Sequence, residues 1–214
     1  MQYLIDSANP EEIDQALAWG AYGITANPTM YCTQHVQLMD FLQKYSNQAQ
    51  TFLSGEVVGD SVQEMVAQAE QILQLDSKIV IKINFSPEGL EVCHILHNRG
   101  YRCAMTLIFS VAQAVAAINA GADYVFPFVG RTDAFNGGDG LQMVAAVQQI
   151  TARRGVSVVA ASIKSIYQLE ALAKIGVPYA AIPFGLYKQS LSHPLTTSGL
   201  EQFAQDWMKG QQLA

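Results

Sequence analysis

The chain is poor in charged residues and has no cluster of basic ones. Only 14% of its 214 residues are charged, and the net charge is −6 at pH 7. Without a run of Lys and Arg there is no positive surface for nucleic acid, so we predict no nucleic-acid partner. The N-terminal segment reaches an acid at Asp6 without a basic stretch, which argues against a secretory signal peptide.

Cysteine and histidine are also scarce. The three cysteines, Cys32, Cys93 and Cys103, form no C-x-x-C pair, and their odd number fits reduced thiols in a cytoplasmic protein. Of the four histidines, only His94 and His97 share a predicted helix face, and no third ligand is evident beside them. We therefore assign the cysteines no chemistry and predict no metal site.

Two further signals are missing. The apolar stretch 103–122 is interrupted by polar residues such as Thr106 and Gln113, so a strand, a turn and a helix are expected there in place of a membrane span. No G-x-G-x-x-G or G-x-x-x-x-G-K-[ST] follows a predicted strand, which makes a nucleotide-binding fold less attractive. A doubly wound open sheet stays open as an alternative architecture.

Half of the residues are apolar, and they recur as short runs separated by longer amphipathic stretches. Segments 110–113 and 165–168 match the capping box S-x-x-Q, and Asn9 precedes a proline, so the amphipathic stretches are predicted to be helices. Strands are predicted at Gln2–Asp6, Gly23–Ala26, Thr51–Val58, Ile79–Ile83, Arg102–Leu107, Tyr124–Val129, Val156–Ser162 and Tyr179–Ile182.

Strands that alternate with helices pair in parallel through right-handed crossovers. Eight such units in this length predict an α/β protein with a single (β/α)8 TIM barrel over residues 1–214. An additional C-terminal helix is expected at about 195–210, where the sequence is amphipathic.

One lysine lies where a charge is costly. Lys82 belongs to a β-branched run typical of a buried strand, and strand alternation puts it on the same face as Val80. Loss of hydration among apolar neighbours favours the neutral amine, which is a nucleophile towards carbonyl carbon and can form a Schiff base. The alternative is a lysine that reaches water or pairs with a carboxylate.

Polar side chains follow the predicted strands at the end where a barrel places its active site. Two carboxylates beside a lysine suit Schiff-base chemistry, because one can move a substrate hydroxyl proton while the other orders water. Each residue also has a structural explanation, since Asp6 or Ser162 can cap a helix and Thr106 can fill a strand. The strand ends carry Asp6, Thr25, Asn27, Glu56, Lys82, Thr106, Phe128, Arg131, Ser162 and Lys164.

Arg131, Ser162 and Lys164 follow the sixth and seventh predicted strands. Barrel enzymes often bind phosphate near their last strands through backbone amides, hydroxyls and cations, so a small anionic substrate is expected there. The alternative for Arg131 is an ion pair with Asp133 or Asp139.

Six segments resemble the transaldolase family, especially its short branch that includes fructose-6-phosphate aldolases. The resemblance extends over essentially the whole chain, and the segments occur in the family's order. They are 3–6 (YLID), 25–29 (TANPT), 80–83 (VIKI), 106–114 (TLIFSVAQA), 127–131 (PFVGR) and 161–164 (ASIK).

The resemblance implies a class I (β/α)8 enzyme in which Lys82 forms the Schiff base without a metal or cofactor. Asp6 matches the acid/base that handles the C4 hydroxyl proton of the substrate. Glu56 and Thr106 match residues that hold a catalytic water. The substrate-binding residues are then expected to be Thr25, Asn27, Phe128, Arg131, Ser162 and Lys164, of which Arg131 and Lys164 match the phosphate-binding cations.

The family's two activities differ in the fate of the dihydroxyacetone unit on the lysine. Short aldolases carry glutamine at the position of Glu56 and tyrosine at that of Phe128, whereas transaldolases carry the residues found here. Without a phenol to protonate the enamine, the resemblance favours transfer from a ketose phosphate, of the fructose 6-phosphate or sedoheptulose 7-phosphate type, to an aldose phosphate. The resemblance thus places the chain in the pentose phosphate pathway.

Alternatives stay open. Glu56 can be a structural partner of Lys82 and Phe128 can be core filling, and fructose-6-phosphate aldolase is the nearest rival activity. Because Ala26 and Ala104 depart from the family near the substrate, a ketose with a sulfonate terminus is a second alternative. A catalytically silent sugar-phosphate-binding scaffold is disfavoured, since a binding module does not need a buried amine.

The short branch assembles into rings, so the resemblance implies a homo-oligomer, a pentamer or a decamer, in which the C-terminal helix reaches a neighbour. The tail 199–208 is amphipathic and contains Phe203 and Trp207, which fits such docking. Packing of the tail onto its own barrel explains it equally well.

Overall fold

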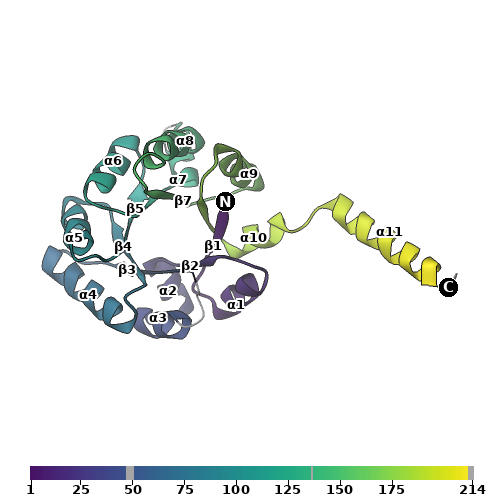
Figure 1. Ribbon diagram of the computed structural model, residues 1–214, viewed down its shortest axis with the longest axis horizontal. Helices are drawn as coiled ribbons and strands as arrows, with labels where there is room; N and C mark the ends of the chain where they lie inside the picture. The colour runs from purple at the N-terminus through teal and green to yellow at the C-terminus, as the bar shows by residue number, and fades with distance from the viewer. Residues whose placement is uncertain (47–50, 136, 212–214) are drawn as a thin grey trace.

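The computed structural model describes residues 1–46, 51–135 and 137–211, and eight parallel strands in it close into a barrel surrounded by helices (Figure 1). Each strand pairs with the next along the chain, and β8 closes the barrel on β1. This arrangement confirms the predicted (β/α)8 fold, and the open doubly wound sheet is excluded. The strands are β1 (Gln2–Asp6), β2 (Gly23–Thr25), β3 (Phe52–Val57), β4 (Val80–Asn84), β5 (Cys103–Ile108), β6 (Tyr124–Pro127), β7 (Ser157–Ala160) and β8 (Tyr179–Ile182).

More helices are present than one per strand. Two separate β2 from β3, two separate β6 from β7, and two follow β8. The helices are α1 (Pro10–Ala18), α2 (Pro28–Gln34), α3 (Leu38–Ser46), α4 (Val62–Leu75), α5 (Pro87–Asn98), α6 (Val111–Asn119), α7 (Val129–Asp133), α8 (Gly140–Thr151), α9 (Ile166–Ile175), α10 (Phe184–Ser190) and α11 (Pro194–Gln211). The stretch 103–122 forms β5 and α6, as predicted.

The capping signals lie where the sequence predicts them. The Ser110 hydroxyl accepts the Gln113 backbone N–H at 3.2 Å, and the Ser165 hydroxyl accepts that of Gln168 at 3.2 Å. The Asn9 side chain accepts two backbone N–H groups in the first turn of α1. Each contact satisfies amide groups that a helix start leaves without a partner, and so fixes where the helix begins.

The predicted strands 124–129 and 156–162 are too long at their C-terminal ends. Helix α7 begins at Val129, directly after the strand, and the Val129 and Gly130 backbone N–H groups bond Ala161 O and Ser162 O at 2.9 and 2.8 Å. The backbone at Ser162 is left-handed, with φ of 57°, which ends the extended conformation. Strand periodicity carries no signal for such a turn.

Strand alternation divides the apolar side chains into two clusters. Ile81 and Ile83 of β4 point outwards and pack with the helices, whereas Val80 points into the barrel with Phe52 and Phe126. Lys82 shares the inward face of Val80, as predicted. The barrel floor below it is apolar, so the Lys82 amine can face solvent only towards the C-terminal ends of the strands.

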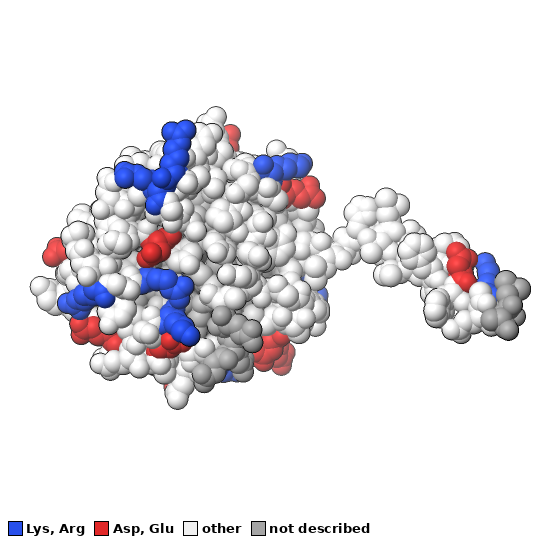
Figure 2. Space-filling model, in the orientation of Figure 1, with Lys and Arg blue, Asp and Glu red and all other residues white. Residues whose placement is uncertain are grey.

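Helix α11 extends away from the barrel (Figures 1 and 2). The helix predicted at about 195–210 is thereby confirmed, but none of its described residues is buried, and the side chains of Phe203 and Trp207 are 75% and 71% exposed. The alternative that this helix packs on its own barrel is therefore wrong for the described residues. No helix in the described ranges has both the length and the apolar character needed to cross a bilayer.

Candidate active site

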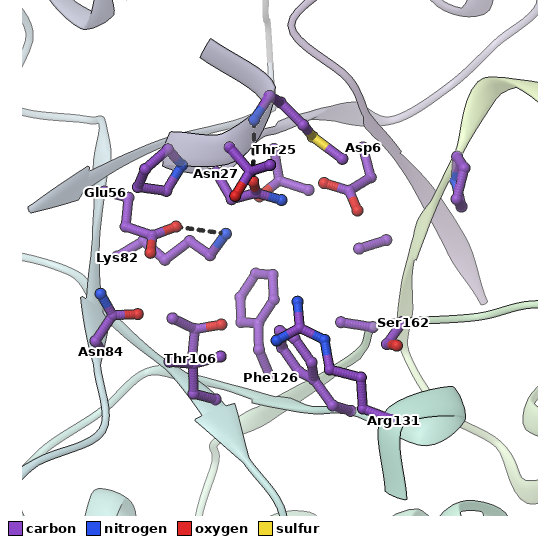
Figure 3. Close-up of a pocket in the computed structure, with 18 of the residues that line it drawn as sticks. Asp6, Thr25, Asn27, Glu56, Lys82, Asn84, Thr106, Phe126, Arg131 and Ser162 are labelled. Carbon is purple, nitrogen blue, oxygen red and sulfur yellow. Dashed lines mark hydrogen bonds and ion pairs between the residues drawn. The ribbon is translucent and has the colours of Figure 1, made fainter. Parts of the chain in front are cut away.

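A pocket of about 350 Å³ opens between the C-terminal ends of the strands (Figure 3). The first four strands and the last four contribute similar numbers of residues to the pocket wall, so residues far apart in the sequence meet there. All ten residues selected from the sequence contribute to its wall: Asp6, Thr25, Asn27, Glu56, Lys82, Thr106, Phe128, Arg131, Ser162 and Lys164.

A buried ion pair lies at one side of this pocket. Lys82 on β4 and Glu56 on β3 occupy the same register position on neighbouring strands, and Lys82 Nζ lies 3.0 Å from Glu56 Oε2. The amine also donates to Ala26 O at 2.9 Å and lies 5.4 Å from the centre of the Phe126 ring. Lys82 and Glu56 are only 4% and 7% exposed. Pairing with a carboxylate, the structural alternative for Lys82, is thus present. The Lys82 amine nevertheless faces the pocket, and a proton can pass between it and Glu56.

Asp6, at the end of β1, is half-buried in the same pocket. Burial raises the pKa of the Asp6 carboxyl above 3.8, because water no longer stabilises the charged form. The Lys82 cation opposes this rise in pKa, the Glu56 carboxylate adds to it, and the cations Lys164 and Arg131 also lower the pKa. A carboxyl with a raised pKa both accepts and returns a proton more readily near neutral pH, as a general acid/base requires.

Two hydroxyls in the pocket have no hydrogen-bond partner among the described protein atoms. Thr106 Oγ1 and Ser162 Oγ are both buried in this state. Ser162 and Leu107 also have left-handed backbone, with φ of 57° and 59°, which costs of the order of 1–3 kcal/mol for residues other than glycine. Unpaired buried hydroxyls and strained backbone concentrate at functional sites, and here both hydroxyls are available to a ligand.

Thr25 and Asn27 are partly engaged in structural contacts. Thr25 Oγ1 accepts the Ser54 hydroxyl at 3.0 Å, and Asn27 Oδ1 accepts the Met30 backbone N–H at 3.2 Å as the cap of α2. The cap fixes the orientation of the Asn27 amide, and it leaves the amide nitrogen free to donate to a substrate oxygen.

The opposite wall of the pocket is cationic. The Arg131 guanidinium stacks at 4.6 Å over the Phe128 ring, and it has no carboxylate within salt-bridge distance in the described part of the chain. The predicted alternative, an ion pair with Asp133 or Asp139, is wrong. Asp133 Oδ1 instead accepts the Gly140 backbone N–H at 2.7 Å, and Asp139 caps α8, so both carboxylates are engaged elsewhere.

Several participants in the site were not selected from the sequence. Asn84 and Phe126 contribute to the pocket wall, and the Ala26 carbonyl binds the Lys82 amine. Strand alternation could have identified Asn84, two residues after Lys82, and Phe126, two residues before Phe128. The Ala26 contact has no such signal, because it joins the end of β2 to β4 across an intervening strand.

Residues 1–46, 51–135 and 137–211 contain no group of three or more His, Cys, Asp or Glu side chains placed to hold a metal ion. Cys93 and Cys103 are buried and Cys32 is exposed, all as free thiols. His94 is hydrogen-bonded to Asn98 on the surface of α5.

A (β/α)8 barrel with a buried ion pair in a pocket at the C-terminal strand ends has the architecture of a barrel enzyme. The family model for Transaldolase/Fructose-6-phosphate aldolase matches residues 3–213, and the chain belongs to this family. It is an enzyme of the transaldolase type, with aldolase activity as the alternative within the family.

Full-length bacterial relatives carry the same assignment. The chain is 38% identical over 212 residues to a probable transaldolase of Desulfitobacterium hafniense (strain DSM 10664 / DCB-2), covering 98% of this chain and 99% of the relative. It is 37% identical over 210 residues to one of Kosmotoga olearia (97% and 96% covered). It is 38% identical over 210 residues to one of Symbiobacterium thermophilum (97% of each covered).

The raised pKa of Asp6 predicts a pH-dependent stability effect. The folded protein binds this proton more tightly than the unfolded chain, so ionisation of Asp6 destabilises the fold as the pH rises from 3.8 through the folded-state pKa. Asp6→Asn is therefore expected to raise Tm at neutral pH, by about 2–4 °C for each kcal/mol, and to lose this gain towards pH 4. Thermal unfolding at a series of pH values measures the difference.

Asp60→Asn is the control, because Asp60 is exposed, takes part in no ion pair among the described residues, and its replacement removes the same charge. An equal gain in Tm for both variants at neutral pH would show a general charge effect and contradict the role given to burial of Asp6.

Proposed function

We propose that this protein is a transaldolase, which transfers a dihydroxyacetone unit from a ketose phosphate to an aldose phosphate through a Schiff base on Lys82. The observation that carries the proposal is the buried Lys82–Glu56 pair, which opens into a pocket with a second carboxylate, Asp6, and two cations on the far wall. A lysine held at 3.0 Å from a carboxylate in a closed barrel can lose a proton to it and attack a carbonyl.

The first half of the reaction forms and cleaves the donor adduct. Neutral Lys82 adds to the C2 ketone, and loss of water with a proton supplied by Glu56 gives an iminium. Asp6 takes the proton of the C4 hydroxyl, the C3–C4 bond breaks, and its electron pair moves into the enamine that stays on Lys82. The leaving fragment is an aldose phosphate with a new aldehyde at the former C4.

The second half reverses these steps with another aldose phosphate. The enamine carbon attacks the acceptor aldehyde, and Asp6 returns its proton to the new hydroxyl. A water held by Glu56 and Thr106 then adds to the iminium, and the product ketose leaves Lys82. The unpaired Thr106 hydroxyl supports this role, because it is buried in the pocket and free to bond a water.

Arg131 and Lys164 bind the terminal phosphate in this proposal, and Asn27 and Ser162 bind substrate hydroxyls. Donors of the fructose 6-phosphate and sedoheptulose 7-phosphate type place their phosphate several carbons from C2, which suits cations on the opposite wall from Lys82. A sulfonate is also a tetrahedral oxyanion, so a sulfonated ketose is the second candidate donor. The phosphorylated donors would give the enzyme a role in the pentose phosphate pathway.

Transfer is preferred over release because of the surroundings of Phe128. Its ring is covered on one face by the Arg131 guanidinium and contacts Phe109 in an edge-on arrangement at 5.4 Å. Because phenylalanine has no hydroxyl, this side chain offers the enamine no proton, and release of free dihydroxyacetone requires one. Fructose-6-phosphate aldolase, which would release dihydroxyacetone and glyceraldehyde 3-phosphate, is the runner-up activity.

Borohydride trapping tests the Schiff base. The protein is incubated with fructose 6-phosphate, reduced, digested and mapped by mass spectrometry, and a reduced adduct is expected on Lys82. Lys82→Met should abolish the adduct and lower turnover by more than about a thousandfold, because covalent catalysis is lost. Lys78→Met, at the exposed start of the same strand region, is the control and should keep both. If no adduct forms on Lys82, or if the Lys82→Met variant is trapped to the same extent, the proposal is wrong.

The partition between transfer and release tests the roles of Glu56 and Phe128. The double variant Glu56→Gln with Phe128→Tyr is expected to raise the ratio of acceptor-independent dihydroxyacetone release to transfer at least about tenfold, a change of about 1.4 kcal/mol in relative barriers. The measurement compares fructose 6-phosphate turnover without acceptor and with erythrose 4-phosphate. Phe109→Tyr adds the same hydroxyl outside the pocket and should leave the ratio unchanged. Dominant release by the unsubstituted protein would favour the aldolase.

We also propose that the protein is a cytoplasmic homo-oligomer, a pentamer or a decamer, in which α11 docks on a neighbouring subunit. The support is the helix itself: its described residues are unburied, and Leu195, Leu200, Phe203, Trp207 and Met208 are all more than half exposed. Figure 2 shows the charged side chains of this arm near its far end, with a largely uncharged surface before them. Exposed apolar side chains gathered on one element mark an interaction site.

Light scattering after size exclusion tests the assembly. The full chain is expected at a multiple of 23.3 kDa, and Phe203→Glu with Trp207→Glu should shift it towards the mass of one subunit. Gln202→Glu with Gln205→Glu adds the same two charges to the helix without removing an apolar side chain, and it should leave the assembly intact. A full chain that elutes at 23.3 kDa would contradict the proposal.

A further inference from the structure

The two cations of the proposed phosphate site come from separate segments of the chain. Arg131 lies on α7, which follows β6, and Lys164 lies between β7 and α9. Both residues are exposed, and the contact of Arg131 with the Phe128 ring does not involve Lys164, so that contact by itself does not fix their separation. Recognition of a tetrahedral anion by two cations depends on that separation, because each must reach oxygens of the same group.

A chain of hydrogen bonds connects the two segments. The Lys164 backbone N–H donates to Gln168 Oε1 at 2.7 Å, and Gln168 Nε2 donates to Asp133 Oδ2 at 2.6 Å. The other oxygen of the same carboxylate, Asp133 Oδ1, accepts the Gly140 backbone N–H at 2.7 Å. Asp133 is two residues after Arg131, so the bridge runs from the backbone of one cation to the helix of the other.

Backbone contacts join the same segments at their other end. The Gly130 N–H donates to Ser162 O at 2.8 Å, and a Cβ added at Gly130 would lie 2.5 Å from Ser162 O and 2.6 Å from Lys164 Cγ. The start of α7 is therefore in direct contact with the segment of Lys164. The Asp133–Gln168 bond provides a further attachment between the two segments, three residues after Gly130.

The Gln168–Asp133 bond is not needed to cap α9. Gln113 makes the same capping box at the start of α6, where its own backbone N–H donates to Ser110 and its Oε1 accepts the Phe109 N–H at 2.8 Å. In the described structure the Gln113 side-chain amide makes no bond to a carboxylate. The bond from Gln168 to Asp133 is therefore additional to the capping box.

We propose that Asp133 and Gln168 are positioning residues that hold Arg131 and Lys164 at the separation required by the terminal phosphate or sulfonate of the substrate. The inference rests on the proposed function. Its second effect is electrostatic: because the Asp133 carboxylate is engaged by Gly140 and Gln168, it does not pair with Arg131 as an internal substitute for the substrate anion. Release of this carboxylate would both loosen the cations and introduce a competitor.

Gln168→Glu tests the bridge with little other disturbance. The new carboxylate can still accept the Lys164 N–H and preserve the capping box, but it places an oxygen against Asp133 in place of an N–H donor. We expect the inhibition constant of inorganic phosphate and the KM for fructose 6-phosphate to rise about tenfold or more, with kcat nearly unchanged. Trapping of unphosphorylated dihydroxyacetone on Lys82 should be unaffected, since that ligand has no anion.

Two comparisons separate geometry from charge. Gln113→Glu adds the same charge in the same capping context at α6, and its phosphate inhibition constant should stay within about twofold of the unsubstituted protein, less than 0.5 kcal/mol. Asp133→Asn removes a negative charge beside the cations, so a charge effect alone would tighten phosphate binding, whereas loss of positioning weakens it. The double variant Asp133→Asn with Gln168→Glu exchanges donor and acceptor at unchanged net charge, and it should restore much of the affinity.

The outcomes distinguish this inference from the proposed function. If dihydroxyacetone is not trapped on Lys82 in the unsubstituted protein, the proposed function fails, and calorimetric titration with inorganic phosphate still measures the bridge. If trapping succeeds but Gln168→Glu binds phosphate as well as Gln113→Glu does, the bridge has no positioning role. The same conclusion follows if Asp133→Asn binds phosphate more tightly, or if the folded double variant is no better than Gln168→Glu.

Discussion

The buried ion pair between Lys82 and Glu56 is the constraint on which the rest of the site depends. Two charges inside a barrel lose their hydration, and removal of either partner costs about 3–5 kcal/mol because the other is left uncompensated. The pair is tolerated because parallel pairing of β3 and β4 sets the two side chains side by side at 3.0 Å, and the Ala26 carbonyl accepts a further amine proton. The apolar barrel floor then directs the amine towards the pocket.

The pocket contains both carboxylates and cations. Glu56 lies 3.0 Å from the Lys82 amine and Asp6 lines the same pocket, whereas Figure 3 shows Arg131 across the pocket from Lys82; Lys164 also contributes to the pocket wall. Burial raises the pKa of Asp6, so this carboxyl exchanges its proton more readily, while the cations remain open to an anion. The neighbouring carboxylates Asp133 and Asp139 bond backbone amides, and Asp133 also bonds Gln168.

Much of the fold and site was predictable from local patterns, for a physical reason. Alternation along β4 placed Lys82 inside the barrel, and capping boxes such as Ser165–Gln168 marked helix starts, because both depend on residues close in the chain. The strand ends after β6 and β7 were not predictable, since backbone bonds from Val129 to Ala161 turn the chain there. The contact of Lys82 with the Ala26 carbonyl likewise exists only after barrel closure.

The sequence by itself determined the barrel class, the inward lysine and the identity of ten pocket residues. Side-chain periodicity and closeness to a strand end are local properties, even where the exact last residue of the strand is not. Tertiary structure decided the partners. It set Lys82 against Glu56, left Arg131 on the Phe128 ring in place of an ion pair with Asp133, and kept α11 off its own barrel. Such choices depend on which surfaces the closed barrel brings within hydrogen-bonding distance, and residue order alone does not specify that distance.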